Sequence, residues 1–367
     1  MMIKPLTSLR FIFALMVFAS HLDYIRSDDA WFQKVNKLVF AEGYVGVSFF
    51  FMLSGFVLSL TYRERIIQGS VSIKEFWVAR AARIYPLHFV MLLVAIPLTV
   101  PEISTAPPSW LLKFFSNLFL VQSFIPVSDY FFSFNAPSWS ISCELFFYLM
   151  FPWIILALYR KKINFAVCIL FILLIPLGTY VFPPALEHRF FYINPLFRLA
   201  DFLIGILIFE LYDKGIFDKF FKSKRTATLL ETLAVTLFLL FFAFHSFIPQ
   251  GYRYASYYWL PITLLLMAFA YQKGYLSQLL SVKLLYVLGE RSYGFYLLHI
   301  LVMRYMLFIN RKLQLIANDY LLTCCIFTVV LMASFFSYKI IEVPANRYIR
   351  KKYQDYLSDM KTARITN

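Results

Sequence analysis

Residues 43–62 read GYVGVSFFFMLSGFVLSLTY, a stretch of twenty residues without Asp, Glu, Lys or Arg. About 20 apolar residues are what an α-helix needs to cross the hydrocarbon core of a membrane. The apolar side chains run continuously and do not alternate, and a spanning segment must satisfy its backbone groups within lipid. The stretch is therefore predicted to be a transmembrane helix.

Similar apolar runs recur along the chain on both sides of this stretch. Of the 367 residues, 61% are hydrophobic and 15% are charged, whereas a soluble globular protein has about 25% charged residues. The mean hydropathy is +0.69. We predict an all-α polytopic membrane protein with ten spans, at roughly 6–22, 43–62, 84–100, 139–158, 163–182, 196–212, 229–247, 257–272, 293–309 and 320–341.

The loops on the two sides of the predicted membrane differ in positive charge. The loops on the side of the N-terminus hold 24 of the 35 Lys and Arg residues, and the opposite loops hold 8. Cytoplasmic loops carry such an excess of cations, so both termini are predicted to lie in the cytoplasm. The net charge of +15 then follows from topology, and no nucleic-acid partner is expected.

The segment 110–125 is also apolar, but it contains Lys113 and is bounded by Pro107, Pro108 and Pro126. If it crossed the membrane, every later loop would change sides and the charge asymmetry would vanish. We therefore expect it to lie in the outer interface or to re-enter the membrane.

No internal repeat or linker divides the chain. We predict a transmembrane domain over 1–345 and a basic cytoplasmic tail over 346–367. The first apolar run is expected to be a retained span and not a signal peptide. The four cysteines fall in apolar runs without the spacing of a disulfide framework or a zinc site, so no metal is expected.

Two ionisable residues share the first span. A charged side chain inside a membrane is costly, which makes it a functional candidate. Arg10 and His21 are eleven residues apart, close to three helical turns, so they lie on one helix face about 16 Å apart along the axis. The alternative is that Arg10 reaches lipid phosphate and His21 caps the helix.

Arg80 and Arg83 precede the third span at a spacing that places both on one helix face. Guanidinium groups bind phosphate oxygens bidentately. On the cytoplasmic side, the pair is predicted to hold a phosphate-bearing cofactor. The alternative is a positively charged membrane anchor.

Glu144 lies in the fourth span, about 7 Å from its outer end by helical rise, which is a depth similar to that of His21. A carboxylate at this depth is predicted to orient the His21 imidazole. The alternative is a structural partner for Arg198 or Arg304.

The remaining histidines in apolar runs, His88, His245 and His299, are expected to serve packing and hydrogen bonding. The sequence contains no P-loop, dinucleotide-binding glycine pattern, HExxH or nucleophile elbow, which argues against a membrane ATPase.

Six short motifs follow one another along the chain. They are Leu6-Thr7-Ser8-Leu9-Arg10 with His21, Gly43-Tyr44-Val45-Gly46-Val47 with Phe49 to Phe56, Arg80 and Arg83 before Ile84-Tyr85-Pro86, Ser138 to Glu144, Leu288-Gly289 through His299, and Glu342-Val343-Pro344. In this order they resemble acyltransferase family 3, the bacterial membrane enzymes that acylate cell-envelope sugars. Cys143 and Leu298 depart from the residues usual in the family, valine and tryptophan.

The resemblance implies an acyl-coenzyme A donor from the cytoplasm, with acetyl-CoA as the default, and a glycan or lipid-linked sugar acceptor at the periplasmic side of a bacterial inner membrane. It makes His21 the essential histidine, Arg10, Arg80 and Arg83 the essential arginines, and Glu144 the carboxylate that ends the Ser-Trp-Ser motif. The chain is expected to lack the extra periplasmic hydrolase-like domain of some members.

These residues predict a mechanism in which the arginines hold the coenzyme A phosphates and His21 deprotonates an acceptor hydroxyl, with Glu144 orienting it. A covalent acyl-His21 intermediate is the less favoured variant. The alternative function is a transporter of an envelope polysaccharide or its precursor, because intramembrane charges also line transport paths.

Overall fold

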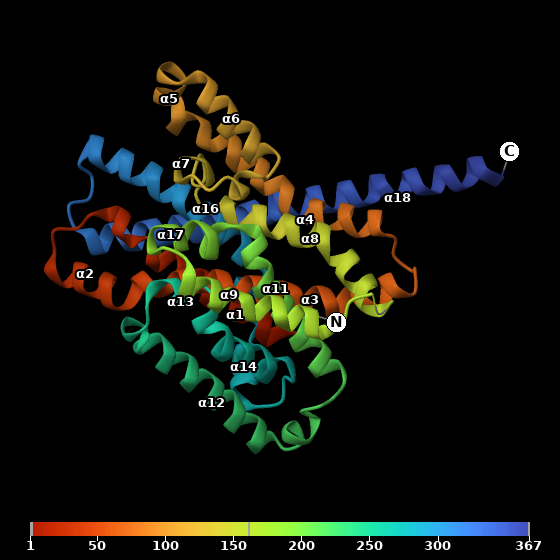
Figure 1. The fold of residues 1–367 in the computed structure, drawn as a ribbon. Helices are drawn as coiled ribbons and strands as arrows, with labels where there is room; N and C mark the ends of the chain where they lie inside the picture. The colour runs from red at the N-terminus through yellow and green to blue at the C-terminus, as the bar shows by residue number, and fades with distance from the viewer. Residues whose placement is uncertain (1–2, 161, 366–367) are drawn as a thin grey trace.

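The computed structural model describes residues 3–160 and 162–365, and all regular elements in them are helical, which confirms the all-α prediction (Figure 1). The longer helices are α1 (Lys4–Ser20), α3 (Gly46–Ile67), α4 (Ile73–Ala95), α6 (Pro107–Leu118), α8 (Ser138–Tyr159), α9 (Phe165–Val181), α11 (Pro195–Asp213), α12 (Lys224–Ala243), α14 (Trp259–Ala270), α16 (Lys283–Leu313), α17 (Asp319–Ser337) and α18 (Val343–Ile365). Shorter helices join them: α2 (Ala30–Val35), α5 (Val100–Thr105), α7 (Ser128–Phe131), α10 (Pro184–Glu187), α13 (Gln250–Arg253) and α15 (Tyr275–Leu280), with helical turns such as η3 (Ala41–Val45), η6 (His188–Ile193) and η10 (Tyr338–Glu342).

Several of these helices are long and apolar enough to cross a membrane. Within the described residues there are seven such stretches, or eight if the pair Pro184–Ile193 and Pro195–Asp213, bent by 51°, forms one span. Phe165–Val181 and Ser256–Ala270 are apolar but shorter. Each of the ten predicted spans coincides with a helix, so a multi-span protein is confirmed. The count of ten membrane spans and the cytoplasmic location of both termini stay predictions.

The segment that was predicted not to cross the membrane contains α6. With 12 residues, this helix is about 18 Å long, well short of the roughly 30 Å hydrocarbon core. It is amphipathic: Lys113, Ser116 and Asn117 are buried, while Leu111 and Phe115 are exposed. Figure 1 shows α5 and α6 together at one end of the molecule. The length of α6 is consistent with either an interfacial or a re-entrant segment.

The centre of the molecule is built from α1, α3, α11 and α16. Helix α3 packs along α11, and α1 packs along α16. At the α3–α11 contact, a Cβ added to Gly205 would overlap the carbonyl of Met52, and one added to Gly55 would overlap that of Phe202. Only glycine allows the two backbones to lie this close, as in other closely packed membrane helices.

Candidate active site

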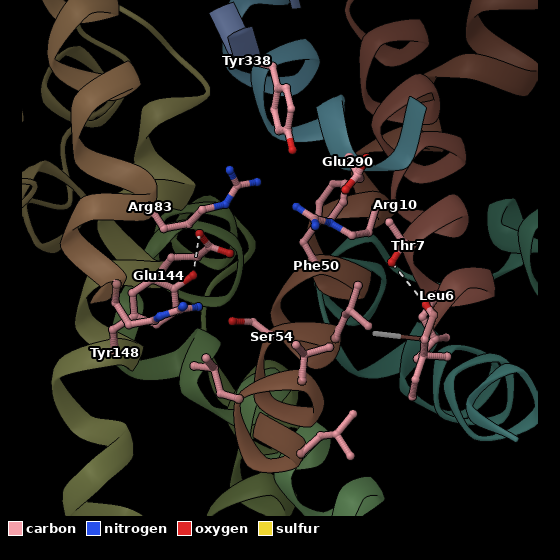
Figure 2. A pocket seen from close by; sticks show the side chains of 16 residues that line it. Leu6, Thr7, Arg10, Phe50, Ser54, Arg83, Glu144, Tyr148, Glu290 and Tyr338 are labelled. Atoms are coloured by element: carbon pink, nitrogen blue, oxygen red, sulfur yellow. Dashed lines mark hydrogen bonds between the residues drawn. The ribbon is translucent and has the colours of Figure 1, made fainter. Parts of the chain in front are cut away.

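Three cavities lie inside the helix bundle and share lining residues. The first, here the arginine cavity, has a volume of about 360 Å³ and is lined by Arg10, Arg80, Arg83, Glu144 and Tyr148, among others. The side chains come from α1, α4 and α8. Figure 2 shows Arg10 and Arg83 reaching toward each other from different helices, with Glu144 nearby.

The other two cavities continue from the first. A middle cavity of about 70 Å³ shares Arg10, Arg83 and Glu144 with the arginine cavity. A third of about 270 Å³, here the histidine cavity, is lined by His21. Val47 and Tyr296 line both the middle and the histidine cavity. The two groups of predicted site residues therefore lie at the two ends of one row of cavities.

Local sequence sets the position of the arginines on α4. The helix begins with a capping box, in which the Glu75 N–H donates to the Ser72 hydroxyl at 3.1 Å and the Ser72 N–H donates to the Glu75 carboxylate at 2.8 Å. Two helix-end N–H groups are thereby satisfied. Arg80 and Arg83 follow on one face, as predicted, and both line the arginine cavity.

The three arginines have different partners. Arg83 forms an ion pair with the buried carboxylate of Glu342 at 2.9 Å. Arg80 donates to the Tyr62 hydroxyl at 3.1 Å and lies over the Tyr62 ring. Within the part of the chain that the structure describes, Arg10 makes no hydrogen bond.

This pairing leaves two guanidinium groups without a carboxylate hydrogen bond at the arginine cavity. Five N–H donors on each planar guanidinium match the oxygens of phosphate or carboxylate. Arg10 and Arg80 can therefore bind an anionic group, whereas part of the charge of Arg83 is offset by Glu342. The sequence predicts one shared role for the three arginines and gives no sign that Glu342 is a partner of Arg83.

The predicted contact between Glu144 and His21 is wrong. Glu144 lines the arginine and middle cavities and accepts a hydrogen bond from the Tyr148 hydroxyl at 3.2 Å. The alternative partners are also occupied elsewhere, because Arg198 pairs with Asp201 at 3.3 Å and Arg304 donates to the Phe134 carbonyl. A catalytic role for Glu144 stays a prediction.

The start of α8 explains this error. The predicted depth of Glu144 is counted from Trp139, the first residue of the predicted span, as if Trp139 lay at the membrane surface. Trp139 is buried, and Ser138 before it is completely buried. The preceding segment folds over it: the Gln122 amide donates to the Ser138 carbonyl at 3.1 Å, and the Ser142 hydroxyl donates to the Leu120 carbonyl at 2.6 Å. Helix α8 therefore begins inside the protein, and Glu144 lies deeper than the count predicted.

The partner of His21 is another histidine. His21 follows the last residue of α1, and its Nδ1 lies 2.7 Å from the Val17 carbonyl and 3.3 Å from Nε2 of His299. His299 is completely buried on α16, and its Nδ1 contacts the Tyr296 carbonyl.

These contacts determine which nitrogens carry protons. A carbonyl only accepts, so Nδ1 donates in both rings, and Nε2 of each neutral ring keeps a lone pair. Nε2 of His299 then accepts from Nδ1–H of His21. Nε2 of His21 is left unprotonated, which is the state that a general base requires.

The sequence predicts a packing and hydrogen-bonding role for His299, whereas the structure places this residue against His21, the predicted base. Its position inside an apolar span was the available signal, because ionisable residues in spans are functional candidates. His88 and His245 lie apart from this pair: His88 hydrogen-bonds the Asn117 carbonyl, and His245 the Phe242 carbonyl.

The fold and the cavities define a helical membrane protein with an arginine-lined cavity joined to a histidine pair. The chain belongs to acyltransferase family 3, whose model, described as an acyltransferase domain, matches residues 4–339. The chain is therefore a member of a family of membrane acyltransferases.

Two curated relatives illustrate the similarity. Acyltransferase MdmB of Streptomyces mycarofaciens is 32% identical over 331 residues, which cover 83% of this chain and 79% of MdmB. Peptidoglycan O-acetyltransferase OatA of Listeria monocytogenes is 29% identical over 322 residues, which cover 81% of this chain and 49% of OatA. The chain thus spans about half the length of OatA. A comparison with solved structures gives no significant match.

Proposed function

We propose that the protein moves an acyl group, acetyl in the simplest case, from cytoplasmic acyl-coenzyme A to a hydroxyl of a cell-envelope or lipid-linked glycan. It would do so within the bacterial cytoplasmic membrane. The observation that carries the proposal is the row of cavities from Arg10 and Arg80 to His21. The relative OatA is named a peptidoglycan O-acetyltransferase, and this name supports a cell-envelope glycan as the acceptor.

The arginine cavity suits the donor. Arg10 and Arg80 offer guanidinium donors for phosphate, while Leu53, Val57 and Leu58 supply an apolar wall for the pantetheine arm. A volume of about 360 Å³ is at the lower end of ligand pockets. It would hold the arm and thioester while the nucleotide lies at the mouth.

His21 suits the role of general base. Its Nε2 would take the proton of the acceptor hydroxyl, and the resulting imidazolium keeps Nδ1–H hydrogen-bonded to Val17 and His299. A hydrogen bond to a charged group is stronger than one to a neutral group, so both contacts gain strength as the charge forms.

The transfer itself balances without another reactant. The acceptor oxygen attacks the thioester carbonyl carbon, a C–O bond forms and the C–S bond breaks. The leaving thiolate takes the proton held on Nε2 of His21, which restores the neutral ring. The products are the acyl ester and free coenzyme A. An acyl-His21 intermediate would instead require Nε2 to attack the carbonyl first.

The cavity dimensions favour this proposal over a glycan transporter. The middle cavity, at about 70 Å³, is the smallest of the three, against about 360 and 270 Å³ for the two cavities that it joins. A passage this much smaller than either cavity favours a thin pantetheine arm over a sugar as the group that enters it.

Radiolabelled acetyl-CoA and purified protein in nanodiscs test the proposal, with isolated envelope glycans as acceptors. Wild-type protein should transfer label, and His21→Ala should lower transfer by about 10²- to 10⁴-fold, as expected for loss of a general base. His245→Ala, a histidine that lines none of the three cavities, should keep wild-type transfer. Transfer that persists in folded His21→Ala protein would exclude this role.

A further inference from the structure

The histidine cavity has an aromatic wall. Tyr44, Trp139, His188, Tyr192 and Tyr254 all line it. Their rings contact one another: the centroids of Trp139 and Tyr192 are 4.7 Å apart, those of Tyr192 and Tyr254 are 5.5 Å apart, and those of His188 and Tyr254 are 5.4 Å apart. Four separate segments of the chain thus contribute to one continuous aromatic surface beside His21.

The same cavity carries no formal charge. None of the described residues that line it is Asp, Glu, Lys or Arg. Two acids lie beside its wall. Glu42 is buried and already paired: it accepts from Arg253 at 2.6 Å, from the Tyr258 hydroxyl at 2.9 Å and from the Tyr44 hydroxyl at 3.1 Å. Glu187 precedes His188 and lies close enough to Tyr254 to add to the effect of burial in raising the pKa of its hydroxyl, but it does not line the cavity. A charged ligand would therefore lose its hydration here without gaining an ionic partner among the residues that line the cavity.

Polar groups without protein partners project from this aromatic wall. The His188 imidazole, the Gln250 amide and the Tyr254 hydroxyl make no hydrogen bond within residues 3–160 and 162–365, and none of the three is fully buried. Burial raises the pKa of Tyr254 to about 12, so its hydroxyl keeps its proton at neutral pH and can donate. These groups can bind hydroxyls at the edge of a ring whose face lies on the aromatic surface.

The physical properties of the wall point to one class of ligand. The face of an aromatic ring is partly negative and attracts the partly positive C–H groups on the face of a sugar ring. A volume of about 270 Å³ lies just below the range of typical ligand pockets, about 300–1,000 Å³. It accommodates one ring and not an oligosaccharide.

We propose that the histidine cavity binds a single uncharged, hydroxyl-bearing sugar ring of the acceptor, with Tyr254 and His188 as specificity-determining residues. This inference rests on the proposed function in one respect, namely that the bound ring presents its hydroxyl to His21. The ring can belong to a polymer or to a lipid-linked sugar, since both offer the same chemistry at this wall.

Saturation-transfer NMR on the full-length protein in nanodiscs tests ring binding without requiring catalysis. Methyl glucopyranoside and methyl N-acetylglucosaminide are the neutral probes, and glucuronic acid is the anionic probe. Tyr254→Ala and His188→Ala should each raise the Kd of the neutral probes about 3- to 10-fold, the range expected for loss of one aromatic contact. Tyr254→Phe should keep the stacking face and lose less. Tyr257→Ala, whose ring stacks on Phe241 at 4.8 Å, is the matched control and should bind as wild type.

A kinetic experiment separates this inference from the proposed function. With acetyl-CoA as donor, the alanine variants at Tyr254 and His188 should raise the KM of the neutral glycoside by the same factor and leave the KM of the donor unchanged. Acyl transfer with an unchanged acceptor KM in both variants, or equal binding of glucuronic acid, would overturn the ring site and leave the proposed function standing. Ring binding by a wild-type protein that transfers no acyl group would overturn the proposed function and leave the ring site standing. An acceptor polymer and a lipid-linked sugar, compared as substrates, identify the source of the ring.

Discussion

His299→Ala should slow acyl transfer without abolishing it. The substitution removes the nitrogen that accepts the Nδ1–H of His21 at 3.3 Å, while the Val17 carbonyl at 2.7 Å remains. His21 therefore keeps its tautomer and loses one of two groups that stabilise its protonated form. His299 is thus a positioning residue in this mechanism, since it acts on the reaction through His21.

The size of the effect follows from the geometry. A hydrogen bond to a charged group contributes about 1.5–3 kcal/mol, and one between neutral groups about 1 kcal/mol. The gain on protonation is the difference between these values, about 0.5–2 kcal/mol. Because 3.3 Å is long for a hydrogen bond, we take the lower part of this range, about 0.5–1 kcal/mol. That corresponds to a fall in kcat of about 2- to 5-fold, which is smaller than the loss expected for His21→Ala.

The assay is steady-state release of coenzyme A, with kcat and the donor KM measured separately. His299→Gln should recover part of the lost rate, because its amide oxygen can accept from His21 Nδ1–H where alanine cannot. Both variants should leave the donor KM unchanged, since the arginine cavity is lined by other residues. An unchanged kcat in folded His299→Ala protein, or a rate for His299→Gln no higher than that for His299→Ala, would refute the reasoning.

Three further predictions concern the arginine cavity and the packing of α3 against α11. Arg10→Ala should raise the donor KM about 10- to 100-fold, the value of one charge-assisted hydrogen bond, in titrations with acyl-coenzyme A; an unchanged KM would show that Arg10 does not bind the donor. Arg83→Ala leaves the buried Glu342 carboxylate without its partner at 2.9 Å. The free energy of unfolding should therefore fall by about 3–5 kcal/mol, seen as a lower melting temperature, and adding Glu342→Gln should restore part of the lost stability. Gly205→Ala should lower the melting temperature by the equivalent of about 1–3 kcal/mol because the new methyl group overlaps the Met52 carbonyl; an unchanged melting temperature would show that α3 and α11 separate freely.

The sequence predicted the helices well and their ends less well. Apolar runs locate a helix because lipid requires about 20 apolar residues. The run predicted at 84–100 belongs to α4, which begins eleven residues earlier, at Ile73. The run at 293–309 belongs to α16, which extends from Lys283 to Leu313. In both cases the helix continues into charged residues that face the arginine cavity, such as Arg80 and Glu290, and hydropathy does not detect such residues.

Positions of site residues on the same helix could be predicted from the sequence. Contacts between site residues on two different helices could not. The shared face of Arg80 and Arg83 follows from helical periodicity, and both line one cavity. Which residue meets His21 depends instead on the relative depth of two helices. That depth is set by the buried loop before α8 and by the packing of α16 against α1, and neither is visible in a pattern along one helix.

Each buried arginine needs a negatively charged partner. This requirement limits which carboxylates can pair with it but does not select a single one. A buried guanidinium needs a nearby carboxylate or a bound anion. Three acids are available to Arg10 and Arg83 in the structure: Glu144 and Glu290 line the arginine cavity, and Glu342 contacts Arg83. In the structure Glu342 binds Arg83, while Glu144 is hydrogen-bonded by Tyr148 and leaves the donors of Arg10 free. This division matters for function, because an arginine whose donors are taken by a carboxylate cannot also hold a phosphate through them. The pairing of Arg83 with Glu342 therefore orders this side of the cavity and leaves Arg10 available to the donor.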